Sequence, residues 1–307
     1  MELHQLRYFV EVSRRRNFTR AAQACRVAQP SLSQQIIKLE KELGQPLLDR
    51  TRRKILLTPA GQRFLPQAQA ILAAVEDARR MVSLDDALHG QLSIGAISTI
   101  APYLLPQILA RFLHSRPQAT VSVVENLTPV LVEACLAGEL DAAIVALPIN
   151  EPMLEAVPLF TESLLLATAY EHPLARQRSV KLTDLTGHPF VLLDPVHCLG
   201  AQIVQFCRDR SCVPVVRCRS SQLLTVQKMV AMGLGLSLIP QMACTTDAAS
   251  GCRYRRLSGD HPQRTIGLVY LRRRFRTPLL EHLLAILRAD ALQKKRLATS
   301  GPARESK

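Results

Sequence analysis

The residues with the clearest chemical potential are two cysteines nine positions apart, Cys198 and Cys207, in the stretch HCLGAQIVQFC. Leu199, Ile203 and Phe206 recur at helical spacing, so the stretch predicts an amphipathic helix after the apolar run VLLDP. Nine residues of helix rise roughly 13 Å, whereas a disulfide requires α-carbons within about 7 Å of each other. The two thiols therefore either never meet or meet only when the helix is lost.

Polar residues elsewhere in the chain can complete a peroxide-reactive site around Cys198. A helix N-terminus, the adjacent His197 and a nearby Arg264 each favour thiolate over thiol, and the thiolate is the species that attacks peroxide. Attack on the O–O bond expels hydroxide, and the donors available to the leaving oxygen are Thr99, Thr128, His197 and Arg264. Each residue alone also has an ordinary explanation: helix caps for the threonines, a turn histidine, a surface arginine and an inert buried thiol.

Length and composition favour a cytoplasmic protein of two or three domains, because 307 residues allow an ample core and the start does not resemble a secretory signal. We expect no membrane span, because no run of 18 uncharged apolar residues occurs. The eight cysteines are expected to be mostly reduced thiols. Their spacing contains no CxxC pair and no metal-type cluster, so we expect neither a metal nor another cofactor.

The formal charge of +14 is concentrated at the two ends of the chain. Residues 1–60 carry 12 Lys and Arg against 5 Asp and Glu, and residues 251–307 carry 14 against 4. A basic first domain suggests a polyanion as partner, although basic character alone also fits a solvated surface. The basic C-terminal end is more simply explained as a frayed tail.

The first sixty residues predict three short helices followed by a basic wing. An apolar stripe begins at Leu3, and the segments RAAQACRV and AQPSLSQQIIKLEKELG predict the second and third helices. In the third helix Ile36, Leu39 and Leu43 are expected to face inward and small polar side chains outward, which suits docking in a major groove. The run LLDRTRRKILLTPAG predicts two short strands joined by Arg-Arg-Lys, which are positioned for phosphates. A structural three-helix cap with a solvated polar face is the alternative from this pattern alone.

This segment also resembles the winged helix-turn-helix of LysR-type transcriptional regulators, along the whole of FTRAAQACRVAQPSLSQQIIKLEKELGQPLLDRTRRKILLTPAG. The resemblance implies that residues 1–58 bind double-stranded DNA, with six residues at the groove and three on the sugar-phosphate backbone. The groove residues are Gln29, Pro30, Ser31, Ser33, Gln34 and Lys38, and the backbone residues are Arg50, Arg52 and Arg53.

A linker helix is predicted over residues 59–89. Its apolar residues alternate at steps of four and three, as in a heptad seam of about three repeats: Phe64, Ala68, Ile71, Val75, Ala78 and Val82. Packing on the protein's own core requires a wider stripe, which Leu65 and Leu72 partly provide. We expect a dimerising helix, as the LysR resemblance also implies.

From Gln91 onward, alternating strand and helix patterns predict an α/β effector domain over residues 90–307. We expect one subdomain over approximately 90–160 and 265–300, and a second over approximately 161–264. Two such subdomains joined by crossover strands form a cleft, as in LysR effector domains and periplasmic binding proteins. Ligands of open α/β sheets bind beyond the C-terminal ends of strands, which is where Thr99, Thr128 and His197 fall.

Four stretches of this second half resemble the peroxide-sensing OxyR subgroup of LysR-type regulators: IGAISTIAPYLLP, the strand end at Thr128, DPVHCLGAQIVQFC and QRTIGLVY. The resemblance implies that Cys198 is the peroxidatic cysteine and Cys207 the resolving one. It also implies that Thr99, Thr128, His197 and Arg264 line the peroxide pocket. On this basis we expect a homodimeric or homotetrameric activator of oxidative-stress genes, not an enzyme, whose partners are DNA, hydrogen peroxide and RNA polymerase.

The chain departs from the subgroup after Cys198-Leu199, where the subgroup often has Arg-Asp and this chain has Gly200-Ala201. The resemblance implies that an aspartate there helps the reaction, so the departure bears on peroxide sensitivity. Glycine costs about 1 kcal/mol against alanine within a helix. Gly200 is therefore expected to ease unwinding, and Gly200→Ala to slow disulfide formation or favour the reduced form. Cys212 and Cys218 are further thiols that can compete as resolving cysteines.

Two other functions fit parts of the sequence. A LysR-type regulator of a small organic acid would have the same cleft, with Thr99 and Thr128 capping a carboxylate, and its activity would survive Cys198→Ser. A thiol peroxidase using Cys198 would show sustained turnover with a reductant but would leave the DNA-binding half without a role.

Overall fold

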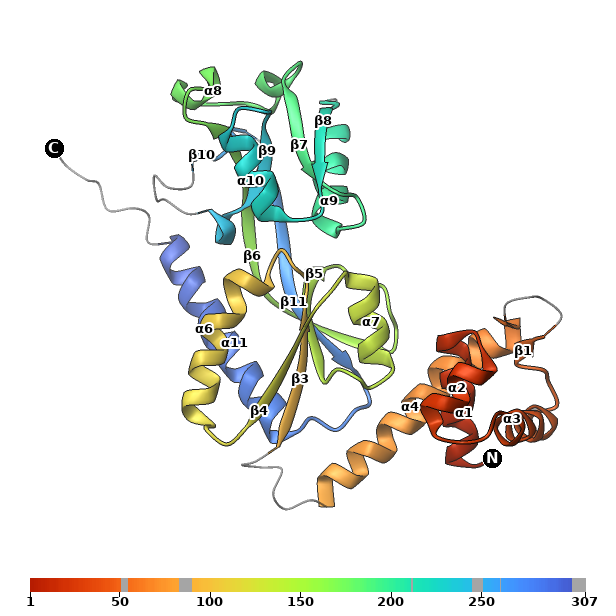
Figure 1. Cartoon of the computed structure of the whole chain (residues 1–307). Helices are drawn as coiled ribbons and strands as arrows, with labels where there is room; N and C mark the ends of the chain where they lie inside the picture. Colours follow the sequence, from red (N-terminus) through yellow and green to blue (C-terminus); the bar gives the residue numbers. More distant parts are fainter. Residues whose placement is uncertain (51–54, 83–89, 211, 245–250, 260, 300–307) are drawn as a thin grey trace.

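Three helices and a small wing form the N-terminal domain of the computed structural model, which describes all residues except 51–54, 83–89, 211, 245–250, 260 and 300–307 (Figure 1). The helices are α1 (Leu3–Arg15), α2 (Phe18–Cys25) and α3 (Gln29–Leu43), and the antiparallel wing strands are β1 (Leu48–Asp49) and β2 (Leu56–Leu57). Asn17 caps α2 by accepting the backbone N–H of Arg20 at 2.9 Å. Gly44 ends α3 with φ of +67°, a conformation that favours glycine.

Apolar residues from the three helices form the N-terminal core. Phe9, Ile36 and Leu39 are fully buried, as the helical pattern predicts. Leu43 is 37% exposed, so the prediction that it faces inward is wrong. It is the last residue of α3, beside the turn at Gly44, and Leu32 one turn before Ile36 completes the buried stripe instead.

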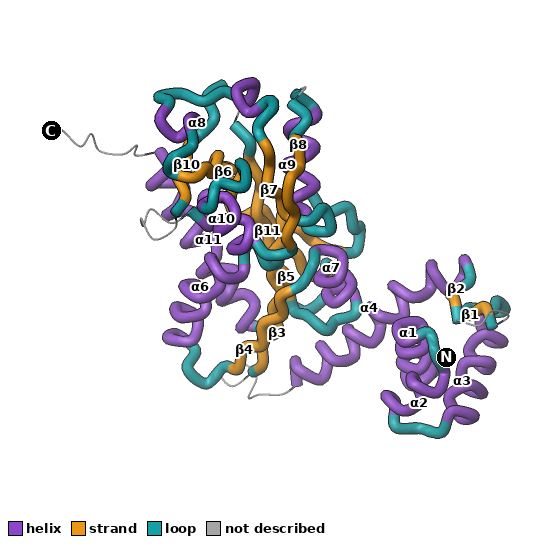
Figure 2. The backbone as a smooth tube through the Cα atoms, turned by 45° about the horizontal axis from the view of Figure 1, so that its top comes forward, coloured by secondary structure: helices purple, strands orange, loops and turns teal. Residues whose placement is uncertain are grey.

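The linker helix α4 (Pro59–Val82) joins the N-terminal domain to the rest of the chain (Figures 1 and 2). Phe64 and Ala68, the first members of the predicted seam, pack in the N-terminal core, and the ring of Phe64 lies 5.5 Å from that of Phe9. Within this chain these two residues therefore serve the domain's own core, as the wider stripe allowed.

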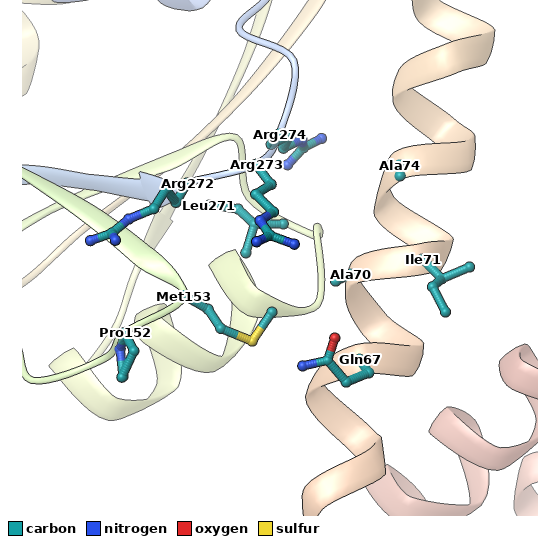
Figure 3. Close-up of a pocket in the computed structure, with 10 residues that line it drawn as sticks. All are labelled: Gln67, Ala70, Ile71, Ala74, Pro152, Met153, Leu271, Arg272, Arg273 and Arg274. Carbon is teal, nitrogen blue, oxygen red and sulfur yellow. The ribbon is translucent and has the colours of Figure 1, made fainter.

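The later part of the seam faces outward. Ile71 and Ala78 are exposed and Val75 is half-buried, whereas the side chain of Val82 and residues 83–89 lie outside the described residues. A pocket of about 480 Å³ separates α4 from the effector region, and Met153 and Arg273 point into it opposite the helix (Figure 3). Ile71 is one of the α4 residues that line this pocket (Figure 3).

A mixed sheet with helices on both faces forms the first subdomain. Its strands run in the order β6–β11–β5–β3–β4, with β3, β4 and β5 parallel and β11 antiparallel to both its neighbours. Helices α6 and α11 pack together on one face and α7 covers the other (Figure 2). The strands are β3 (Gln91–Ala96), β4 (Thr120–Glu125), β5 (Ala142–Leu147), β6 (Leu154–Ala169) and β11 (Gln263–Leu271), and the helices are α6 (Ala101–Ser115), α7 (Thr128–Leu136) and α11 (Pro278–Thr299).

The second subdomain is reached through the long strand β6 and left through β11. Strand β6 pairs with β11 over its first part and with β9 and β10 over its last part. A parallel pair, β7 and β8, lies beside α9 (Figure 1). The elements are α8 (Pro173–Arg176), β7 (Pro189–Leu193), α9 (Cys198–Arg208), β8 (Val215–Ser220), α10 (Leu223–Ala231), β9 (Ser237–Pro240) and β10 (Cys252–Arg255), with 3-10 turns η1 (Leu182–Leu185) and η2 (Gln241–Ala243).

Each subdomain has its own apolar core, one built around β3, β5 and α11 and one around β7, α9 and α10. The α/β arrangement in two subdomains joined by crossover strands agrees with the sequence prediction. Among the described helices, none has the length and apolar character needed to cross a membrane.

Candidate redox site and nucleic-acid interface

The turn after β7 sets the start of α9. The backbone N–H of Val196 donates to Asp194 Oδ1 at 3.0 Å, and that of His197 donates to the Asp194 carbonyl at 2.9 Å. His197 is the N-cap residue in an extended conformation, and Cys198 is the first residue of the helix. The predicted strand, turn and helix are confirmed here, and Cys198 lies where the positive end of the helix dipole is strongest.

Gly200 lies where α9 meets the end of β7. A Cβ added to Gly200 would lie 2.4 Å from the carbonyl oxygen of Leu193 and 2.8 Å from that of Asp194. The glycine therefore allows a close approach between two backbones, and alanine does not fit without a shift. This contact argues against the expectation that Gly200→Ala favours the reduced form, because the reduced packing is the one that the added methyl disturbs.

Cys198 lies at the junction of the two subdomains. It belongs to α9 of the second subdomain, yet its half-buried side chain packs against the core of the first. Leu199, Ile203 and Cys207 on the same helix are buried in the core of the second subdomain. One helix thus carries a thiol at the junction and another in the second core, close to its C-terminal end.

Thr99 and Arg264 are in direct contact. Arg264 donates from Nη1 to Thr99 Oγ1 at 2.8 Å and from Nη2 to the Thr99 carbonyl at 3.1 Å. Both residues are only 2% exposed. Arg264 lies within β11 and is not a surface charge before the strand, so that ordinary explanation is wrong.

Glu162 is a partner of Arg264 that the sequence interpretation missed. The Nε of Arg264 donates to Glu162 Oε1 at 2.7 Å, and Glu162 Oε2 accepts the backbone N–H of Met242 at 3.1 Å. Its sequence signal is an acidic residue within the apolar run TESLLLATA, since a carboxylate there needs a partner. Tyr103 of α6 was also missed, and it packs against the core of the second subdomain.

Thr128 and Thr99 share one edge of the first sheet. The parallel strands β3 and β4 both end at this edge, Thr99 precedes α6, and Thr128 is the first residue of α7. The Oγ1 of Thr128 is buried and has no hydrogen-bond partner within the described residues. Of the predicted pocket residues, Thr99 and Arg264 contact each other. Thr128 lies at the start of α7, and His197 and Cys198 lie at the start of α9.

Cys207 has a second thiol beside it. Burial, together with the neighbouring Cys212 thiol, raises the pKa of Cys207 to about 12. The Cys212 backbone N–H donates to the Cys207 carbonyl at 2.9 Å. Cys218, the other predicted competitor, lies half-buried on β8. Within the described residues, no three His, Cys, Asp or Glu side chains are grouped as metal ligands would be.

The N-terminal half of α3 presents the predicted groove residues on its surface. Gln29, Pro30, Ser31, Gln34 and Lys38 are exposed, and Ser33 is half-buried. Ile37, which the sequence interpretation did not single out, is 48% exposed on this surface, one helical turn after Ser33. Exposed apolar residues at such a position can contact a thymine methyl group.

The wing residues are only partly described. Arg50 forms an ion pair with Glu40 at 2.7 Å, and its guanidinium lies 5.3 Å from the ring centroid of Phe18. These two contacts hold the Arg50 side chain against α3 and α2, directly after the wing strand β1. Arg52 and Arg53 lie outside the described residues.

Comparisons with known proteins agree with this architecture. The bacterial regulatory helix-turn-helix family, lysR type, matches residues 3–62, and the LysR substrate binding domain family matches residues 85–292. The Escherichia coli K12 DNA-binding transcriptional dual regulator OxyR is 38% identical over 272 residues, covering 88% of this chain and 89% of that protein.

Two solved structures resemble the whole chain. A full-length OxyR variant from Pseudomonas aeruginosa gives a TM-score of 0.71 at 31% identity and covers 95% of each chain. A peroxide-bound OxyR cysteine mutant from Corynebacterium glutamicum gives a TM-score of 0.61 at 34% identity and covers 99% of each chain. With a helix-turn-helix domain, a linker helix and a two-subdomain α/β region in this order, the chain belongs to the LysR family of bacterial regulatory proteins.

Proposed function

We propose that this chain is a DNA-binding transcriptional regulator that senses hydrogen peroxide through Cys198 and stores the signal as a Cys198–Cys207 disulfide. The observation that carries the proposal is that α9 bears a thiol at its first residue, against the first subdomain, and another near its last turn, within the second core. The resemblance to OxyR proteins, one of which is a peroxide-bound structure, supports the same function.

The proposed chemistry has two steps. The Cys198 thiolate attacks one peroxide oxygen, the O–O bond breaks, and Cys198 becomes a sulfenic acid while hydroxide leaves and takes a proton. The Cys207 thiol then attacks the Cys198 sulfur, the S–O bond breaks, and water leaves as the disulfide forms. Thr99, Thr128, His197 and Arg264 are proposed to bind the peroxide and donate to the leaving oxygen. Of these, Arg264 has one further guanidinium N–H, on Nη1, beyond those directed to Glu162 and Thr99.

Formation of the disulfide requires α9 to unwind, so oxidation of the two cysteines is coupled to a change in conformation. Cys198 and Cys207 lie roughly 13 Å apart along the helix axis, against a limit of about 7 Å for the α-carbons of a disulfide. Unwinding moves Leu199 and Ile203, which are buried in the second core. We propose that this repacking shifts the contacts between effector domains in a dimer or tetramer and thereby the spacing of the DNA-binding domains.

The proposal assigns one role to each region of the chain. Residues 1–58 bind double-stranded DNA, residues 59–89 dimerise, and residues 90–307 sense peroxide. We further propose that the protein acts in the cytoplasm as an activator that contacts RNA polymerase, uses no metal or other cofactor and is not a turnover enzyme. An organic acid at Arg264 is disfavoured, because Glu162 already gives that guanidinium an internal carboxylate partner at 2.7 Å.

The decisive experiment compares the full-length protein with Cys198→Ser and Cys207→Ser before and after micromolar peroxide. We expect a mass change consistent with a disulfide in the wild type, no response in Cys198→Ser, and a sulfenic acid in Cys207→Ser that a dimedone probe captures. Hydrogen exchange across residues 197–210 should lose its helical protection in the oxidised wild type. An unchanged peroxide response in Cys198→Ser, or equal protection in both redox states, overturns the proposal.

A further inference from the structure

Cys212 is a buried thiol that the proposed sensing chemistry does not use. It follows the end of α9, is 2% exposed, and its Sγ is directed to the carbonyl oxygen of Leu182 at 3.6 Å. Cys207 is completely buried in the same core. Both side chains belong to the same apolar core, and the neighbouring Cys212 thiol contributes to the raised pKa of Cys207.

The backbone brings these two cysteines together at the end of α9. The Cys212 N–H donates to the Cys207 carbonyl at 2.9 Å. This bond joins residues five positions apart and turns the chain back over the last turn of α9, as the 6→1 bond of a Schellman motif does. A disulfide requires α-carbons about 4.4–6.8 Å apart. Cys198, in contrast, is separated from Cys207 by roughly 13 Å of helix. In the folded α9 the thiol within reach of Cys207 is therefore that of Cys212 rather than that of Cys198.

We propose that Cys207 and Cys212 form a second thiol–disulfide couple. Its disulfide replaces the Cys198–Cys207 disulfide, so that Cys198 becomes a free thiol again and α9 refolds. The proposal rests on the proposed function for its first disulfide only, because the Cys207–Cys212 pairing itself needs no peroxide chemistry at Cys198.

The exchange step is balanced without an external oxidant or reductant. The Cys212 thiolate attacks the Cys207 sulfur, the Cys198–Cys207 bond breaks, and Cys198 leaves as a thiolate. The proton lost by Cys212 is matched by the proton that Cys198 gains. One disulfide is consumed and one is formed, so the protein remains oxidised by two electrons overall.

The direction of the exchange follows from the helix. The Cys198–Cys207 disulfide cannot coexist with α9, whereas the Cys207–Cys212 disulfide joins residues that are already hydrogen-bonded neighbours at its C-terminal end. Refolding of α9 and burial of Leu199 and Ile203 therefore favour the second disulfide. Only four residues separate the two cysteines, so the attacking thiol stays at a high effective concentration throughout.

Tryptic mapping of the full-length protein distinguishes the two disulfides. Trypsin releases residues 182–208 with both Cys198 and Cys207, residues 211–217 with Cys212, and residues 218–219 with Cys218. After alkylation at low pH, a Cys198–Cys207 bond stays within one peptide, whereas a bond to Cys212 joins two peptides. Chymotryptic cleavage after Phe206 then separates Cys198 from Cys207 and identifies the partner of Cys212.

Two arms test the couple and the exchange separately. In Cys198→Ser treated with diamide, we expect the Cys207–Cys212 bond to form. In the wild type after a peroxide pulse, we expect Cys198–Cys207 first and Cys207–Cys212 later. Cys212→Ser should retain Cys198–Cys207 several-fold longer, and Cys218→Ser, the matched control, should decay as the wild type does.

Each outcome has a defined meaning. Cys207 and Cys212 that both stay alkylatable in diamide-treated Cys198→Ser overturn the couple. Equal lifetimes of Cys198–Cys207 in the wild type and Cys212→Ser overturn the exchange. A wild type in which peroxide oxidises no Cys198 contradicts the proposed function instead, and the diamide arm still decides whether the couple exists.

Discussion

Arg264 on β11 and Glu162 on β6 lie directly opposite each other in the antiparallel register, as a buried ion pair 2.7 Å long. These are the strands that connect the two subdomains, and the same arginine holds Thr99 at the edge of the first sheet. A buried pair of this kind gives little net stability but is costly to break, because the remaining charge has no partner. Its contribution here is to fix the position of one guanidinium and one threonine beside the proposed peroxide site.

Glu162→Gln should destabilise the protein markedly, because it leaves the Arg264 charge buried without its carboxylate. We expect the free energy of unfolding to fall by about 3 kcal/mol or more, measured by urea denaturation. Glu171→Gln is the matched control, since Glu171 forms an exposed ion pair with Arg176 and its loss should change little. Similar stability of both variants would mean that the buried pair is not maintained in solution.

Gly200→Ala should weaken the reduced state. The added methyl overlaps the carbonyls of Leu193 and Asp194, and such overpacking typically costs about 1–3 kcal/mol. Hydrogen exchange of α9 in the reduced protein should become faster, and the Cys198–Cys207 disulfide should form faster after peroxide. Ala201→Ser, at the next and exposed position, is the control. Slower disulfide formation in Gly200→Ala would instead favour the helix-propensity argument.

The alkylation of Cys207 should depend steeply on pH. Because burial raises its pKa to about 12, the folded state favours the thiol over the thiolate. The stabilisation of packed α9 by this thiol is complete below the ordinary cysteine pKa of 9.0 and is lost as the pH rises toward 12. Iodoacetamide labelling of the reduced protein should therefore be slow at neutral pH and accelerate through this window. Labelling of Cys207 at neutral pH as fast as in the urea-unfolded protein contradicts its burial.

Ile71→Glu should dissociate the linker contact between subunits. Ile71 is exposed and lines the open pocket beside α4, so the charge is tolerated in a monomer but not in an apolar seam (Figure 3). Sedimentation velocity at micromolar concentration measures the result, with Arg79→Gln, at another exposed position of α4, as the control. A mutant that keeps the wild-type assembly would exclude this part of the helix from the interface.

Substitutions in the N-terminal domain should separate affinity from specificity. Neutralising Arg52 and Arg53 should weaken binding to all duplexes and lower the salt slope by about 1 per phosphate contact removed. Gln34→Ala or Ile37→Ala should instead change the preferred sequence, because both side chains are exposed on α3. Footprints at several salt concentrations test both expectations, and footprints unaffected by every substitution would contradict the assignment of α3.

The fold was largely predictable because its patterns are local. The alternation of strands and helices after Gln91, the stripe of α3 and the helix start at Cys198 each depend on short-range periodicity and caps. Leu43 was misplaced because periodicity does not tell where the neighbouring core ends. Phe64 and Ala68 were assigned to a partner because a seam and an internal contact share the same spacing.

The site was predictable in its residues but not in its contacts. The pairing of Arg264 with Glu162 depends on the register of two strands about a hundred positions apart, which local patterns do not determine. The role of Gly200 depends on the closeness of β7, and helix propensity alone gave the opposite expectation. The proximity of Cys212 to Cys207 arises from the turn after α9, outside any helical repeat.

The separation of Cys198 and Cys207 along α9 also leaves Cys198 open to overoxidation. In the proposed mechanism Cys198 remains a sulfenic acid until the helix opens and Cys207 arrives, and during that interval a second peroxide can convert it irreversibly to sulfinic acid. A more stable α9 lengthens this interval, and a less stable one shortens it at the expense of the reduced resting state. The close backbone contact at Gly200 thus bears on tolerance of excess oxidant, and variants selected for survival at high peroxide should concentrate around the start of this helix.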